Sequence, residues 1–327
     1  MTAATWHALS SSGAIADLSS GVRLRLSGPD ALRYLNGQVT NDVRKLRPGH
    51  ALPACLTNHK GKLEAFVHLT LAPDGALLIS ADGDLRDFLP LRLEKYLIAD
   101  DCVLEDVTET TTLLHLLAAA EQIASLLVDG EHPAVTNRFS LPASAPTEPA
   151  PSHGNAGSDR PLFQGHDLWT TPDRLPFWLS RFPVLSAEDQ STLEVLHGIP
   201  AWGHELTQGL LPPEAGLDAT AIDYHKGCYI GQEVISRIRS VGRVNRLLTP
   251  LIQTSGPPLQ PGWTVFSPAP DGTPAPAGTL TRTADHPLTG QRHALAFLRR
   301  GISGPLRSGP DATAAEAQID VRKTLDD

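Results

Sequence analysis

The residues best suited to chemistry lie in one stretch, Tyr224–Gly242, which reads YHKGCYIGQEVISRIRSVG. Cys228 stands between two glycines, and Lys226 lies two residues before it. Apolar residues recur at helical spacing afterwards, which predicts a helix that begins near Ile230 and ends at Gly242. A helix N-terminus and an ammonium group both stabilise a thiolate, so the stretch predicts an unusually acidic and reactive cysteine.

A second interpretation of Cys228 stays open, because a lone cysteine is more often a small buried hydrophobe than a reactive group. Cys55 and Cys102 sit in apolar, strand-like sequence and are predicted to be of that kind. Three cysteines so scattered form neither a disulfide framework nor a closed zinc site. No His-x-x-x-His or Cys-x-x-Cys spacing occurs, so no permanent metal site is predicted.

Cations gather around the same predicted helix, where Arg237, Arg239, Arg243 and Arg246 follow Lys226. The whole chain has a formal net charge of −9, so a local cluster of five cations stands out. One interpretation is a solvated helix face. The other is a surface that recognises carboxylates, phosphates or the glutamyl tail of a cofactor.

Hydrophobic patterning predicts the elements that position this stretch. Alternating residues predict a strand over 22–26, and a proline in the following turn predicts a helix over 31–38. Runs at 63–71 and 76–81 around Pro-Asp-Gly predict a hairpin. Further helices are predicted at 84–97, 118–128 and 187–196, and further strands at 102–107 and 112–117. Helices mixed with hairpins favour an α+β fold.

The C-terminal part predicts short strands at 246–253, 262–266, 278–283 and 293–298, with Pro/Gly turns between them. Such even spacing is typical of a small barrel. The predicted division is an N-terminal α+β lobe at 1–139, a Pro/Ala/Ser-rich loop at 140–161, a second α+β lobe with the cysteine motif at 162–243, a β-barrel at 244–306 and a polar tail at 307–327.

Charge and hydropathy exclude several classes of protein. The formal net charge of −9 argues against generic nucleic-acid binding. No apolar run approaches the ~18 residues that a membrane span needs. The N-terminus lacks the basic and apolar regions of a signal peptide. We therefore expect a cytoplasmic protein without a membrane partner.

The motif Lys226–Glu233, KGCYIGQE, resembles the signature of the YgfZ family, the folate-binding relatives of the glycine-cleavage T-protein. A Cys, a Tyr and two Gly at fixed positions make this a specific pattern. The stretches Ser27–Val43, Thr57–Leu63 and Gly198–Asp218 also resemble the family. The similarity therefore runs in order from about Val22 to Leu298.

The resemblance implies two interleaved T-protein-like α+β lobes and a small C-terminal β-barrel around a folate-sized central cavity. It implies a factor that supports assembly or repair of iron–sulfur clusters in client proteins, linked to tetrahydrofolate or a derivative, with an indirect effect on tRNA modification. The predicted catalytic residues are Cys228, Lys226 and Tyr229, and no permanent metal is expected. The predicted cofactor-binding residues are Gln232, Glu233, Arg237 and Asn41.

Two departures from the T-protein pattern argue against aminomethyl transfer. T-proteins place a catalytic Asp shortly after the stretch that matches Thr57–Leu63. Here only Glu64 offers a carboxylate, about one residue out of register, so a strand would turn it to the other face. The T-protein Glu that grips the pterin ring is replaced by Leu196, followed by His197 and Gly198.

Three functions follow from these observations. The favoured one is an accessory factor, rather than a classical enzyme, that acts on iron–sulfur client proteins through Cys228. The alternative is a tetrahydrofolate-dependent aminomethyltransferase, in which Glu64 or another carboxylate would replace the missing Asp. The third is an RNA-interacting module built on Arg237–Arg246, against which the acidic charge and the small number of aromatics argue.

Overall fold

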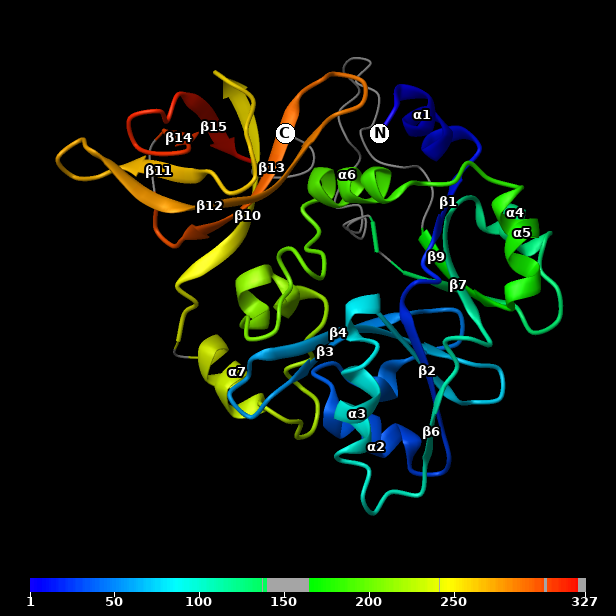
Figure 1. The fold of residues 1–327 in the computed structure, drawn as a ribbon. Helices are drawn as coiled ribbons and strands as arrows, with labels where there is room; N and C mark the ends of the chain where they lie inside the picture. Colours follow the sequence, from blue (N-terminus) through cyan, green and yellow to red (C-terminus); the bar gives the residue numbers. More distant parts are fainter. Residues whose placement is uncertain (137, 140–164, 241, 303–304, 323–327) are drawn as a thin grey trace, which may run out of the picture.

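A computed structural model describes residues 1–136, 138–139, 165–240, 242–302 and 305–322. The described chain forms two antiparallel sheets with helices packed on them and a closed barrel (Figure 1). This architecture confirms the predicted α+β class with a C-terminal barrel. The predicted Pro/Ala/Ser-rich loop lies outside the described residues.

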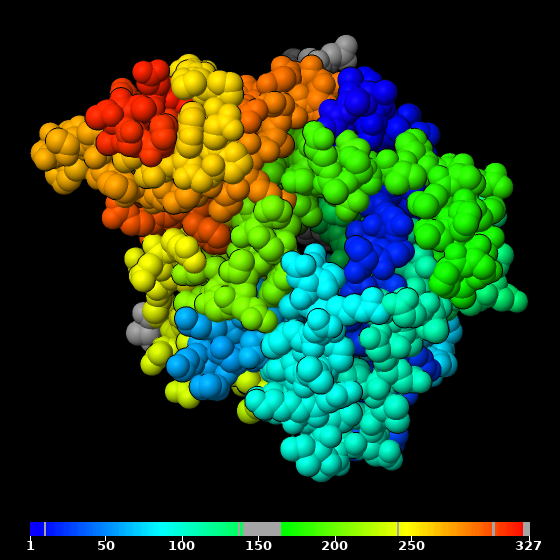
Figure 2. Space-filling model, viewed as in Figure 1, coloured from blue at the N-terminus to red at the C-terminus, as the bar shows by residue number. Residues whose placement is uncertain are grey.

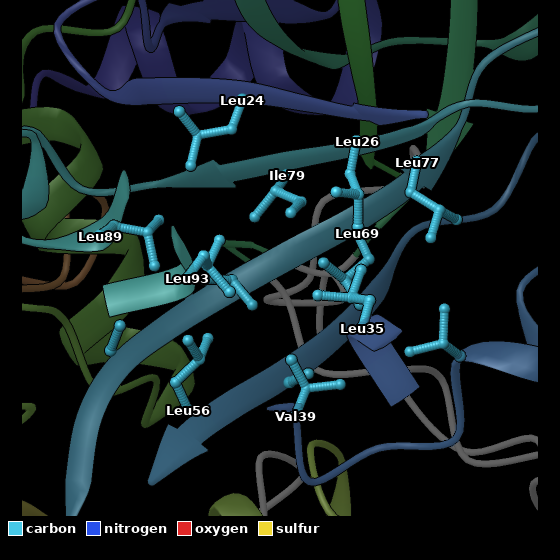
Figure 3. Packing of buried hydrophobic residues seen from close by; sticks show 14 of the residues in the cluster. Leu24, Leu26, Leu35, Val39, Leu56, Leu69, Leu77, Ile79, Leu89 and Leu93 are labelled. Atoms are coloured by element: carbon cyan, nitrogen blue, oxygen red, sulfur yellow. The ribbon is translucent and has the colours of Figure 1, made fainter. Parts of the chain in front are cut away.

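The first lobe is a five-stranded sheet in the order β3-β4-β5-β2-β6, covered by two helices. Alternation in β2 sends Leu24 and Leu26 into the core, where they meet Leu35 of α2 and Leu89 of α3 (Figure 3). Its elements are β2 (Val22–Ser27), α2 (Ala31–Gln38), η1 (Val43–Lys45), β3 (Leu52–Thr57), β4 (Leu63–Leu71), β5 (Leu77–Ala81), η2 (Gly83–Leu85), α3 (Leu89–Glu94) and β6 (Val103–Asp106).

The second lobe is a four-stranded sheet in the order β1-β7-β9-β8. Its elements are α1 (Ala3–Ser11), β1 (Ala14–Asp17), β7 (Thr112–Leu117), α4 (Ala120–Ala124), β8 (His132–Val135), β9 (Gly165–Thr170), η3 (Pro172–Arg174), α5 (Leu175–Leu179) and α6 (Ala187–His197). Strands β1, β7 and β8 precede the predicted boundary at residue 139, and β9 follows it. β7 and β8 pair with β9, and β1 pairs with β7, so all four strands form one sheet. That boundary is therefore wrong, because the lobes interleave along the chain.

The barrel closes in the order β10-β13-β12-β11-β14-β15. Its strands are β10 (Arg246–Ser255), β11 (Thr264–Pro268), β12 (Pro274–Asp285), β13 (Arg292–Arg299), β14 (Leu306–Gly309) and β15 (Ala317–Val321). The prediction of a polar tail at 307–327 is wrong for the described residues. Ala317 and Ile319 are buried, and β15 pairs with both β10 and β14 to complete the closure.

A buried charge network couples the barrel to the second lobe. Arg282 of β12 donates to the Glu205 carboxylate at 2.7 and 3.1 Å and to the Ile199 carbonyl at 3.0 Å. It also pairs with Glu194 of α6. Since Glu205 has no solvent exposure, removing either partner would leave a buried charge uncompensated. The network therefore fixes α6 against the barrel, as Figure 1 shows.

Candidate functional site

Cys228 lies in an irregular segment that follows η4 (Pro212–Ala215) and η5 (Leu217–Ala219) and leads into α7 (Gln232–Ser240). Its side chain is exposed to solvent, which excludes the alternative of a buried hydrophobe. The predicted position at the helix N-terminus is wrong, because α7 begins only at Gln232. Cys228 therefore lies outside the first turn, where the helix dipole acts.

We call the irregular segment at residues 220–231 the cysteine segment. It is held by the turn between β3 and β4, and Figure 1 shows α7 beside the end of this hairpin. The Thr57 hydroxyl donates to the Ile230 carbonyl at 2.6 Å. Gly231 has φ +88°, and a Cβ on it would lie 2.4 Å from the Asn58 carbonyl oxygen. Only glycine permits both this backbone conformation and this close approach. The spacing of the motif thus serves to dock the cysteine segment on the first lobe.

Lys226 points into the first lobe and not toward solvent. Its ammonium donates to the carbonyls of Asn36, Val39 and Asn41 at 2.6, 2.6 and 2.8 Å, so all three of its protons are bonded. Burial lowers the pKa of Lys226 to about 8. These contacts make Lys226 an anchor of the cysteine segment, and its predicted catalytic role has no separate support.

Tyr229 and Asn41 are likewise committed to the fold. Tyr229 is buried against Ile222 and Ile235, which raises the pKa of its hydroxyl. Within the described residues that hydroxyl has no hydrogen-bond partner. The Asn41 amide donates to the carbonyls of Pro53 and Thr220 at 2.9 and 3.1 Å, which uses both of its hydrogens. A contact of Asn41 with a cofactor remains a prediction.

Exposed cations lie on the elements that adjoin the cysteine segment. Arg237 and Arg239 lie on α7 and Arg243 just beyond it, with Arg239 stacked 4.0 Å above the Tyr224 ring. Exposed Lys60 and Lys62 belong to the β3–β4 turn, which packs against α7 through Gly61. We call Lys60, Lys62, Arg237, Arg239 and Arg243 the basic surface.

Two members of the predicted cation cluster are not part of the basic surface. Lys226 is buried, and Arg246 lies on β10, where it pairs with Glu214 at 3.2 Å. Of the remaining predicted cofactor residues, Gln232 is half-buried and Glu233 is exposed, both in the first turn of α7. Glu233 is the acidic residue that this helix contributes beside the basic surface.

Of the other two cysteines, Cys55 is buried as predicted, whereas the prediction of a buried residue is met only in part by Cys102. Cys55 is fully buried, and burial raises its pKa to about 12. Cys102 is half-buried, and burial together with neighbouring Asp100 raises its pKa. In the part of the chain that the structure describes, no group of three or more His, Cys, Asp or Glu side chains could hold a metal ion.

Alkylation of the native protein should therefore discriminate among the three thiols. We expect iodoacetamide to modify Cys228 first and Cys102 more slowly, with Cys55 modified only after unfolding. Peptide mass spectrometry after timed labelling, with and without urea, measures this order. Equal labelling of Cys55 and Cys228 in the native state would contradict the burial difference.

The positions that carry the T-protein carboxylates are changed in this chain. Thr57 pairs with Leu63 and Leu56 with Ala65, so Glu64 is the extra residue of a β-bulge. Its carboxylate accepts a 2.5 Å hydrogen bond from Arg92 Nε. No sequence pattern indicated this partner of Glu64, because Arg92 lies on α3, 28 residues further along the chain.

Leu196, at the pterin-gripping position, is buried against Trp6 and Leu9 in the core beneath α1 and α6. The face in Figure 2 is hollowed between α6, the segment that follows it and the first lobe. Leu196 is an apolar core residue, and the Glu64 carboxylate is paired with the Arg92 guanidinium. The residues present therefore do not reproduce the T-protein grip on folate.

Comparison with known proteins gives curated relatives whose names indicate different functions. An aminomethyltransferase of Geobacillus thermodenitrificans is 26% identical over 325 residues, 94% of this chain and 82% of that protein. Two others are an iron–sulfur cluster assembly factor and a tRNA-modifying protein. The mitochondrial iron–sulfur cluster assembly factor IBA57 homolog of Chaetomium globosum is 30% identical over 288 residues, 83% of this chain and 63% of that protein. The tRNA-modifying protein YgfZ of Hamiltonella defensa is 27% identical over 224 residues, 65% of this chain and 62% of that protein. The chain thus spans less than two thirds of the length of each of these two relatives. No protein-family model matches it.

The fold has a counterpart among solved structures. The glycine cleavage system aminomethyltransferase T from Bartonella henselae matches 98% of this chain and 88% of its own, with a TM-score of 0.77 at 15% identity. The chain therefore has the T-protein fold. Within that class, the curated relatives confirm the resemblance to the YgfZ family indicated by the cysteine motif. None of the described helices combines the length and apolar character needed to cross a membrane.

Proposed function

We propose that this chain is an accessory factor that helps assemble or repair the iron–sulfur clusters of client proteins through the thiol of Cys228. The observation that carries the proposal is the exposure of this thiol on a segment anchored by Lys226 and Thr57. The name of one relative, an iron–sulfur cluster assembly factor, supports the same class of function.

One cysteine can supply one ligand to a cluster iron, so the other ligands would come from the donor or the client. In the exchange, a bond from Cys228 Sγ to iron forms while an iron–thiolate bond of the donor breaks. The proton of Cys228 passes to the released thiolate. A thiolate-ligated cluster is anionic, and the basic surface beside Cys228 would favour its approach.

The link to tetrahydrofolate rests on the family resemblance. Leu196 replaces the carboxylate that grips the pterin ring in T-proteins, and Glu64 is paired with Arg92, so the proposed exchange at Cys228 involves no folate. The same two residues argue against the aminomethyltransferase alternative, which the name of the Geobacillus thermodenitrificans relative supports. A cytoplasmic location likewise stays a prediction.

Loss of the chain should lower the activity of enzymes that carry iron–sulfur clusters and spare those that do not. The test deletes the gene in its own organism and assays a hydro-lyase with a four-iron cluster beside a cluster-free dehydrogenase. We expect a loss confined to the cluster enzyme, restored by the wild-type chain. Equal activity of the cluster enzyme in both strains would overturn the proposal.

A further inference from the structure

A cavity separate from the cysteine segment lies between the barrel and the segment after α6. Its volume is about 650 Å³, and its walls come from β10, β11, β12 and β13 on one side and residues 204–210 on the other. This volume lies within the range of roughly 300–1,000 Å³ typical of small-molecule sites. Neither Cys228 nor any residue of α7 lines it.

The strand register brings two arginines together in this cavity. Arg246 of β10 pairs directly with Arg299 of β13, and the same register sets Thr279 of β12 opposite Phe297. Like charges that face each other across a strand pair are destabilising unless an anion compensates them. Glu214 compensates Arg246. No ion pair to Arg299 occurs within the described residues.

The carboxylate that lines the cavity cannot compensate Arg299, because it is already committed. Glu205 is bound by Arg282, by the Thr281 hydroxyl at 2.6 Å and by the Ala201 N–H at 3.2 Å. Its side chain is completely buried. Arg299 is therefore an exposed lining residue without an ion-pair partner in the described chain, and no lining residue supplies a free carboxylate.

The remaining lining groups suit an anion with an organic body. The hydroxyls of Thr264 and Thr279 make no hydrogen bond within the described chain and are free to donate. Phe297 supplies an aromatic surface, over which the Arg246 guanidinium lies at 4.5 Å from the ring centroid. A guanidinium pair is well matched to carboxylate or phosphate oxygens.

We propose that this cavity binds a small organic anion whose carboxylate or phosphate oxygens bridge Arg299 and Arg246. The site is independent of Cys228 and goes beyond the proposed function in iron–sulfur assembly. The bound anion would form an ion pair with Arg299, and the body of the ligand would contact Phe297, Thr264 and Thr279.

Isothermal titration with citrate and with glucose 6-phosphate tests the proposal and separates carboxylate from phosphate recognition. Glucose is the uncharged control. We expect one anion to bind with a stoichiometry of one and glucose not to bind. Arg299→Gln should weaken binding by at least about tenfold, because it removes a charge-assisted hydrogen bond to the anion. Thr279→Val should weaken it by a smaller factor.

Arg307→Gln is the matched control, because it removes the same charge from an exposed position on β14 outside the cavity. It should leave the affinity unchanged, as should Cys228→Ala. The proposal is overturned if neither anion binds, if glucose binds equally well, or if Arg307→Gln weakens binding as much as Arg299→Gln. Since Cys228 is outside the cavity, none of these failures bears on the function in iron–sulfur assembly.

Discussion

Cells whose single copy of this chain carries Cys228→Ala should show iron–sulfur enzyme activity no higher than cells that lack the chain. Of the three cysteines, Cys228 is the most exposed, so the substitution removes the thiol that is most accessible to a client protein. Because the side chain is exposed and makes no packing contact with the described core clusters, alanine should leave the fold intact. The measurement is the activity of the cluster enzyme at equal levels of the two proteins.

Cys102→Ala is the matched control for this experiment. It makes the same chemical change at a half-buried thiol of the first lobe, and it should restore activity as the wild type does. A far-ultraviolet circular dichroism spectrum and an unchanged urea midpoint would show that Cys228→Ala is folded. Full rescue by folded Cys228→Ala would exclude a role for the thiol.

Sequence patterns predicted correctly those helices and strands that are determined by residues close together in the chain. The alternation of Val22, Leu24 and Leu26 gave β2, and the proline at position 29 marked the start of α2, with bounds that match the structure. The predicted helices at 84–97 and 118–128 are mainly turns around the short helices α3 and α4. Their leucines follow helical spacing because they cover a sheet, which irregular turns also achieve.

Long-range pairing could not be predicted from the same patterns. β15 is a short segment, AQIDV, whose apolar and polar residues alternate, and the prediction of a polar tail overlooked this pattern. That it completes the barrel depends on β10 and β14, which lie on either side of it. Likewise, β1 and β7 flank the whole first lobe in sequence and pair with each other in the second. Such pairings depend on contacts between distant segments, which hydropathy within a short window does not encode.

The candidate site shows the same division between local and distant causes. The glycines on either side of Cys228 indicated close approach. Gly231 meets the Asn58 carbonyl as expected, but the expectation is wrong for Gly227, where an added Cβ would meet no atom within 4 Å. The proximity of Lys226 in sequence suggested a charge beside the thiol. The three carbonyls that bind its ammonium come from the region of α2, far earlier in the chain, so the sequence could not reveal its role as an anchor.

Lys226→Met should lower the free energy of unfolding by about 3 kcal/mol or more. The variant leaves the carbonyls of Asn36, Val39 and Asn41 without this donor, and each unsatisfied buried acceptor costs roughly 1–3 kcal/mol. The lower desolvation cost of methionine offsets part of that loss. Urea denaturation followed by circular dichroism measures the difference.

Lys60→Met is the matched control, because it removes the same group from an exposed position on the β3–β4 turn and should change stability by less than about 0.5 kcal/mol. Hydrogen exchange adds a local measurement, since loss of the anchor should speed exchange at Ile230 and Ile235 more than in the barrel. If Lys226→Met were as stable as Lys60→Met and exchanged at wild-type rates, the three carbonyl contacts would not hold the cysteine segment. The exposed position of Cys228 would then need another structural cause.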